Sequence, residues 1–160
     1  MAFVLKKVLF LDFDGVLNTE KYIRCCGGTG LMLDPSKLIL LRQIIDETDA
    51  KIVLSTSWRE YWYPDAARCC ETGKQIHEIF ESCGLTILDK TPILGGRRET
   101  EIYNWLVQHP EAESFAVLDD MRLDAEFMRG HFVKTSGYSR GLDKAALEET
   151  VEILRKGRKA

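Results

Sequence analysis

The sequence predicts an α/β fold, a three-layer sandwich in which helices cover both faces of an open, mostly parallel sheet. Short apolar runs of strand length alternate with longer segments whose apolar residues recur at helical spacing, which is typical of a parallel sheet covered by helices. The chain has 160 residues, of which 45% are hydrophobic and 29% charged, enough for one domain with a substantial core. We therefore expect a single domain over residues 1–160.

Three apolar runs are predicted to be buried strands, and two weaker ones are predicted to be minor strands. The strong runs are residues 8–11, 51–54 and 115–118, and the weak ones are 85–88 and 132–133. Between them, helical periodicity predicts one helix from Pro35, capped by Asp34, and a second that contains residues 76–80 and ends at Gly84. A third helix is predicted over 99–108, and a closing helix follows Asp143.

Two stretches lack this periodicity. They cover residues 19–33, which are rich in glycine, and residues 60–73, which hold consecutive aromatic residues. Each follows the carboxyl end of a predicted strand, the sheet edge at which open α/β folds bind ligands. We expect these inserts to line the site. Neither is long enough to form a full cap domain, so the site is predicted to be open.

The strongest local signal is DFDGVLN at residues 12–18, where the first strand ends. Asp12 and Asp14 are expected near one another because the chain turns at Gly15, which tolerates unusual dihedral angles. Two carboxylates this close repel each other unless a cation or a shared proton compensates. A turn with exposed acids is common for a lone Asp-Gly pair, but it explains less well a DxDG sequence that ends a buried strand.

A second acidic cluster follows the strand at 115–118. It consists of Asp119 and Asp120, with Asp124 four residues later. Parallel strands end at the same sheet edge, so the two acidic clusters are expected to converge. Ligand sets made only of carboxylates suit hard cations, above all Mg²⁺. The sequence therefore predicts a magnesium site.

Candidate phosphate contacts lie between the two acidic clusters. Ser55 and Thr56 end the strand at 51–54, where a hydroxyl and backbone N–H groups can hold phosphate oxygens. Arg98 lies at the start of the helix predicted over 99–108, and it is the preferred cation for neutralising both the phosphate and Asp12. Arg97 and Lys90 are the alternatives for that role.

These four elements, in this order, resemble the motifs of the haloacid dehalogenase (HAD) superfamily. The first is DFDGVLN, the second is Ser55 in LSTSWR, the third is Arg98 in GGRRETEI, and the fourth is LDDMRLD. More narrowly, the chain resembles the small HAD domains associated with RNA-repair proteins. The SWREY stretch is also similar to part of small protein phosphatases that act on polymerase tails.

The resemblance implies a HAD-like (Rossmannoid) fold and a phosphatase mechanism that the residue types independently support. Asp12 is the implied nucleophile, which forms an aspartyl-phosphate. Asp14 is the implied general acid, which later activates the hydrolytic water. A second acid at the position of Asp14 marks phosphoryl transfer rather than dehalogenation in this superfamily.

The resemblance also implies how a metal and the phosphate are held. Mg²⁺ is expected to be bound by Asp12, the backbone carbonyl of Asp14 and Asp120. Asp119 or Asp124 is expected to orient metal-bound water. The motif-two hydroxyl and motif-three arginine, Ser55 and Arg98, are expected to stabilise charge on the phosphoryl oxygens.

An open site favours a macromolecular substrate over a small metabolite, either a nucleic-acid end or a phosphoprotein, phosphotyrosine included. Arg59 is expected to contact a further phosphate, with a solvated arginine as the alternative. Trp62 and its neighbours Tyr61 and Tyr63 are expected to stack on a base or a phosphotyrosine ring, with packing beneath the loop as the alternative.

A non-catalytic HAD-like or receiver-like signalling module is the competing function. In receivers, the acidic pair follows the first strand and the phospho-accepting aspartate comes later, whereas here the DxD comes first and the DD late. A silent HAD scaffold is expected to have lost Asp12 or Asp14, and both are present. The order and identity of these acids therefore favour the enzyme.

Charge, hydropathy and cysteine spacing indicate which other classes of protein the sequence does not resemble. The formal net charge of −3 implies no global attraction to nucleic acid or anionic membranes. No apolar stretch approaches the roughly 20 residues needed to cross a bilayer, and no secretory signal is evident, so a cytoplasmic protein is expected. The five cysteines lack metal-ligand spacing and are expected to be free thiols, with a zinc or redox link between the two vicinal pairs as the alternative.

Overall fold

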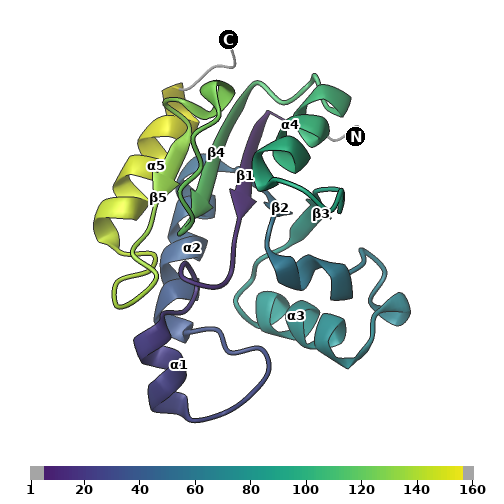
Figure 1. Cartoon of the computed structure of the whole chain (residues 1–160), viewed down its shortest axis with the longest axis vertical. Coiled ribbons are helices and arrows are strands. Elements are labelled where there is room, and N and C mark those ends of the chain that lie inside the picture. Colours follow the sequence, from purple (N-terminus) through teal and green to yellow (C-terminus); the bar gives the residue numbers. More distant parts are fainter. Residues whose placement is uncertain (1–5, 157–160) are drawn as a thin grey trace.

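The computed structural model describes residues 6–156 and places five strands of this part of the chain in one parallel sheet. The strand order is β3-β2-β1-β4-β5, with β1 at the centre (Figure 1). The strands are β1 Lys7–Leu11, β2 Lys51–Leu54, β3 Ile87–Lys90, β4 Ser114–Asp119 and β5 Phe132–Lys134. The predicted α/β sandwich with an open sheet is confirmed.

Five α-helices within the described residues accompany this sheet. They are α1 Glu20–Cys26, α2 Pro35–Thr48, α3 Glu71–Ser82, α4 Arg98–Gln108 and α5 Lys144–Lys156. Short 3₁₀ turns occur at Ser57–Tyr61, Ala66–Arg68 and Glu126–Met128. The predicted start of α2 holds, because Asp34 caps the helix by accepting a hydrogen bond from the backbone N–H of Ser36 at 2.9 Å, and Pro35 occupies the first turn.

The central strand β1 buries both of its faces, which divides the core into two layers. Leu9 and Leu11 pack with apolar residues of α2, α3 and α5 on one face of the sheet. Val8 and Phe10 point the other way and pack against α4. Alternate side chains of a strand point to opposite faces, so a strand covered on both sides is a continuous apolar run. This burial fixes the position of β1 in the sheet, and therefore the position of Asp12, which directly follows the strand.

The structure corrects two expectations about the elements. The third strand lies at residues 87–90 rather than 85–88. The glycine-rich insert at 19–33 contains helix α1, capped by Thr19 and ended by Gly27 in the left-handed conformation. None of the residues in α1 is buried. The helix therefore lacks the apolar stripe by which the sequence pattern detects helices.

No helix in the described part of the chain combines the length and the apolar character needed to cross a membrane. All five cysteines are free thiols in the structure. Cys69 is buried, whereas the vicinal Cys25 and Cys26 are exposed on α1.

The orientation of α2 gives a test of the core. Leu41 is fully buried beneath the helix, whereas Ile39 is 70% exposed on its outer side. We expect Leu41→Ala to lower the free energy of unfolding by about 2–5 kcal/mol because it leaves a cavity. Ile39→Ala is the matched control and is expected to change it by less than about 0.5 kcal/mol. Urea denaturation of both variants measures the difference, and equal losses would contradict this orientation.

Candidate active site

Three polar residues lie side by side at the carboxyl edge of the sheet. The three central strands of the sheet, β2, β1 and β4, lead to Ser55, Asp12 and Asp119, respectively. The strand register places these three residues next to one another. The backbone N–H of Asp12 donates to the carbonyl of Leu118, and that of Ser55 donates to the carbonyl of Leu11, both at 3.0 Å. The sheet ladder therefore continues into this row and fixes its backbone.

The two acidic clusters meet at this edge, as the parallel order of the strands requires. Carboxylate oxygens of Asp12, Asp119 and Asp120 all lie within 4.8 Å of one another. Asp12 and Asp119 are buried, and Asp120 is partly exposed. Two loops more than a hundred residues apart in sequence thus supply one carboxylate cluster.

Two glycines allow Asp120 to approach the cluster. Gly15 has a φ of +82°, and a Cβ there would lie 2.2 Å from a carboxylate oxygen of Asp120. A Cβ on Gly137 would lie 2.4 Å from the same oxygen. Any side chain at either position would displace the Asp120 carboxylate, so the turn after Asp14 requires glycine for space as well as for conformation.

Arg98 is the cation that reaches the cluster. Its Nη1 atom lies 3.1 Å from Asp12 Oδ2 and 2.7 Å from Asp119 Oδ2. Of the two alternatives considered from the sequence, Arg97 pairs instead with Glu99 and Asp124. The other, Lys90, donates to backbone carbonyls of the 57–62 turn. Of these three cations, Arg98 is therefore the one that contacts Asp12, and its role in catalysis stays a prediction.

Asp14 is exposed and lies outside the cluster, and both of its carboxylate oxygens are hydrogen-bonded. Asn18 Nδ2 donates to Oδ1 at 3.1 Å, and the indole N–H of Trp58 donates to Oδ2 at 2.9 Å. Asn18 is itself fixed, because its Oδ1 accepts from the N–H of Gly15 and its amide also donates to the carbonyl of Met32. The side chain of Asp14 is therefore oriented by two neighbours.

The hydroxyl of Ser55 is buried without a hydrogen-bond partner among the described residues. Such a group is costly unless a ligand satisfies it. Its place beside Asp12 makes it suitable for donating to a phosphoryl oxygen. Thr56, the neighbouring candidate, is also fully buried, but its hydroxyl accepts from the N–H of Trp58 at 3.3 Å and caps the turn at 57–61.

A family model for the HAD domain in Swiss Army Knife RNA repair proteins matches residues 8–147. The match spans most of the chain and contains all of the residues that form the carboxylate cluster. The chain belongs to this family. Membership identifies it as a HAD domain and indicates a hydrolase of the phosphatase type. Comparison with curated proteins gave no match, and neither did comparison with solved structures.

Two expected substrate contacts of this HAD domain are buried instead, which corrects the sequence interpretation. The guanidinium of Arg59 lies 2.9 Å from Glu101 and donates to carbonyls of the 56 and 91–92 backbone, so it ties the loop before α4 to the turn at 57–61. Trp62 is 1% exposed and stacks on His77 with ring centroids 5.5 Å apart. Trp62 is unavailable to a substrate because it packs onto α3, and the guanidinium of Arg59, although it borders a hollow of the surface, is already paired with Glu101 and these carbonyls.

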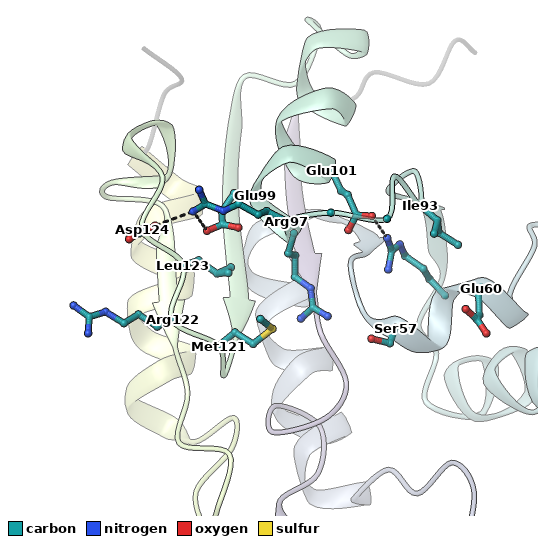
Figure 2. Close-up of a pocket in the computed structure, with 14 residues that line it drawn as sticks. Ser57, Glu60, Ile93, Arg97, Glu99, Glu101, Met121, Arg122, Leu123 and Asp124 are labelled. Atoms are coloured by element: carbon teal, nitrogen blue, oxygen red, sulfur yellow. Dashed lines mark hydrogen bonds and ion pairs between the residues drawn. The ribbon is translucent and has the colours of Figure 1, made fainter.

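Two hollows flank the carboxylate cluster. One, of about 530 Å³, lies between the loop before α4 and the loop after β4, and Arg97 points across it toward Glu99 and Asp124 (Figure 2). The other, of about 460 Å³, is lined by Asp14 and Asp120 together with residues of α1 and of the loop after β5. Asp124 therefore forms an ion pair with Arg97 and is not part of the cluster formed by Asp12, Asp119 and Asp120.

The electrostatics of the cluster favour a bound proton or cation. Burial and then the negative charge of Asp119 raise the pKa of Asp12 from 3.8 to about 8, although Arg98 offsets part of the rise. Burial and the charge of Asp119 also raise the pKa of Asp120. One arginine therefore does not balance three carboxylates.

The donor set fits a divalent metal. All of the clustered ligand atoms are carboxylate oxygens, which suit Mg²⁺. Opposite ligands of one Mg²⁺ lie about 4.2 Å apart, so carboxylates within 4.8 Å need little movement to share it. Both oxygens of Asp119 already accept, from Arg98 and from the N–H of Met121. The oxygens of Asp12 are engaged in the same way, by the N–H of Phe13 and by Arg98, so these contacts do not rank the two residues as ligands. Binding of the metal by Asp12, Asp120 and the Asp14 carbonyl stays a prediction.

The raised pKa of Asp12 predicts how stability depends on pH in metal-free protein. Between pH 3.8 and about 8, folded protein holds a proton on Asp12 that the unfolded chain releases, so the free energy of unfolding falls as pH rises. We expect the melting temperature in EDTA to fall from pH 5 to pH 8, and Mg²⁺ to raise it more at pH 8. Asp12→Asn is the control, in which this component of the slope is lost. An Asp12→Asn protein with the wild-type slope would contradict the assignment.

Proposed function

We propose that the protein is a Mg²⁺-dependent phosphatase that hydrolyses a phosphomonoester through an aspartyl-phosphate on Asp12. The observation that carries this proposal is the setting of Asp12, a buried carboxylate in contact with Arg98 and clustered with Asp119 and Asp120. A carboxylate in such a setting has a cation to screen an incoming phosphate and acids to bind a metal. The non-catalytic alternative gives no reason for Asp14 to be held beside the same cluster.

In the first half-reaction, a carboxylate oxygen of Asp12 attacks phosphorus and the bond to the ester oxygen breaks. The leaving oxygen takes up the electron pair of that bond together with a proton from Asp14. Arg98, which contacts Asp12, and the unpaired hydroxyl of Ser55 would donate to the phosphoryl oxygens, where charge accumulates.

In the second half-reaction, Asp14 accepts a proton from water, and that water attacks phosphorus. The bond between phosphorus and Asp12 breaks, which releases inorganic phosphate and restores the carboxylate. Asp12, Asp120 and the backbone carbonyl of Asp14 would hold Mg²⁺, with the carboxylate of Asp119 beside them. When bound, the ion would screen the repulsion between the nucleophile and the phosphate.

The proposed substrate is macromolecular, with a nucleic-acid end preferred over a phosphoprotein. The inserts form only the short helix α1 and two 3₁₀ turns, so no cap domain closes over the cluster within the described residues. An open edge admits a phosphate at the end of a large molecule. The family description, which names RNA repair proteins, supports the nucleic-acid end.

The first test compares three proteins on a generic aryl phosphate with and without Mg²⁺. We expect wild type to release phosphate only with a divalent ion, and Asp12→Asn to lose at least about a thousandfold in kcat because the nucleophile is gone. Asp124→Asn is the matched control, four residues beyond Asp120 and paired with Arg97 at the surface, and it should retain wild-type kcat. Metal-independent turnover, or full activity in Asp12→Asn, would refute the mechanism.

The hydrogen bond from Trp58 to Asp14 gives a second test. Trp58→Phe keeps an aromatic ring but removes the N–H that orients the general acid. We expect kcat to fall about tenfold for alkyl phosphates, whose leaving oxygen needs a proton, and much less for an aryl phosphate with an acidic leaving group. Tyr61→Phe, next to the same indole, is the control. Equal losses on both substrates would show that Trp58 has only a packing role.

A further inference from the structure

The hollow on the Asp14 side of the cluster contains side chains that the proposed chemistry does not use. It is lined by Asp14 and Asp120, by Ile23 and Arg24 of α1, and by Tyr138 in the loop after β5. We call it the leaving-group hollow. The other hollow, shown in Figure 2, is not lined by Asp14 or Asp120.

The in-line geometry of the proposed displacement assigns a role to this hollow, and this assignment rests on the proposed function. An in-line displacement places the leaving oxygen opposite the attacking Asp12 oxygen, near the acid that protonates it. That acid is Asp14. The group attached to the leaving oxygen therefore extends into the hollow that Asp14 lines.

Tyr138 presents an unpartnered ring in this hollow. The residue is 57% exposed. The ring of each other exposed tyrosine among the described residues has an aromatic or cationic partner: Trp58 for Tyr61, Arg68 and Lys90 for Tyr63, and Phe127 for Tyr103. Tyr138 has no ring or cation contact of this kind in that part of the chain. A free aromatic face beside a catalytic cluster is a surface for stacking.

The backbone around Tyr138 is held in place. Its carbonyl accepts from the N–H of Lys21, and the carbonyl of Gly137 accepts from the N–H of Glu20, both at 3.0 Å. The loop is closed by an antiparallel bridge between Ser136 and Gly141. The loop after β5 is thus tied to α1, which carries Arg24 into the same hollow.

We propose that the leaving-group hollow is a nucleobase subsite, in which a base of the substrate stacks on Tyr138. Arg24, whose exposed guanidinium pairs only with the exposed Glu20 among the described residues, is placed to exchange that partner for the next phosphate of the chain. An aromatic ring beside a cation is complementary to a nucleic-acid chain, in which a base and a phosphate occur in every nucleotide. A phosphotyrosine peptide offers the ring but no regular second anion.

The experiment measures binding, so it does not depend on turnover. Asp12→Asn with Mg²⁺ is titrated calorimetrically with 5′-AMP and with ribose 5-phosphate, which has the same sugar and phosphate without the base. We expect 5′-AMP or, in a parallel arm, 3′-AMP to bind about tenfold more tightly than ribose 5-phosphate. The tighter of the two nucleotides shows which end is used.

Added substitutions then locate the base. Tyr138→Ala should bring the ratio of the two dissociation constants close to one, whereas Tyr138→Phe, which keeps the ring, should preserve it. Tyr103→Ala is the matched control, because this tyrosine is 54% exposed and lies on α4 away from the hollow. Affinity for ribose 5-phosphate should be the same in all of these variants.

Several outcomes would overturn the subsite. They are no preference for either nucleotide over ribose 5-phosphate, an unchanged ratio in Tyr138→Ala, an equal loss in Tyr138→Phe, or tighter Tyr138-dependent binding of a phosphotyrosine peptide. Failure of the proposed function is a separate result, because wild type would then release no phosphate from any substrate while the binding ratio is still measured.

Discussion

The structure depends on one electrostatic constraint: three carboxylates are held within 4.8 Å of one another, two of them buried. Like charges at this spacing in a partly buried site destabilise the folded state unless something compensates them. Arg98 contacts two of the three, and the pKa of Asp12 still rises to about 8. The remaining negative charge is of the kind that a divalent cation compensates.

The fold maintains this arrangement through rigid parts rather than through the acids themselves. The ladder of β1 between β2 and β4 sets the height of Asp12, and the helix α4 begins with Arg98 above it. The buried pair of Arg59 and Glu101 ties α4 to the turn after β2. Arg59, which was predicted to contact the substrate, thus stabilises the position of α4 instead.

Prediction succeeded where a local pattern reports a local structure. The apolar runs at 51–54 and 115–118 are strands, and Asp34-Pro35 starts a helix, because burial and capping leave periodic and positional signals. Helix α1 left no such signal, since it buries no residue. Arg59 and Trp62 were misplaced because a cation and an aromatic ring look the same in sequence whether they face a ligand or the core.

The sequence by itself determined the fold class, the two acidic loops and the hydroxyl and cation between them, since each depends on residues near one another in the chain. Only the tertiary structure decided which arginine meets Asp12, that Trp58 and Asn18 hold Asp14, and that Gly15 and Gly137 make room for Asp120. The longest of these contacts joins Gly15 to Asp120, about 105 residues away in the sequence. Packing between distant segments sets the direction in which these side chains point, and a local sequence pattern carries no information about that packing.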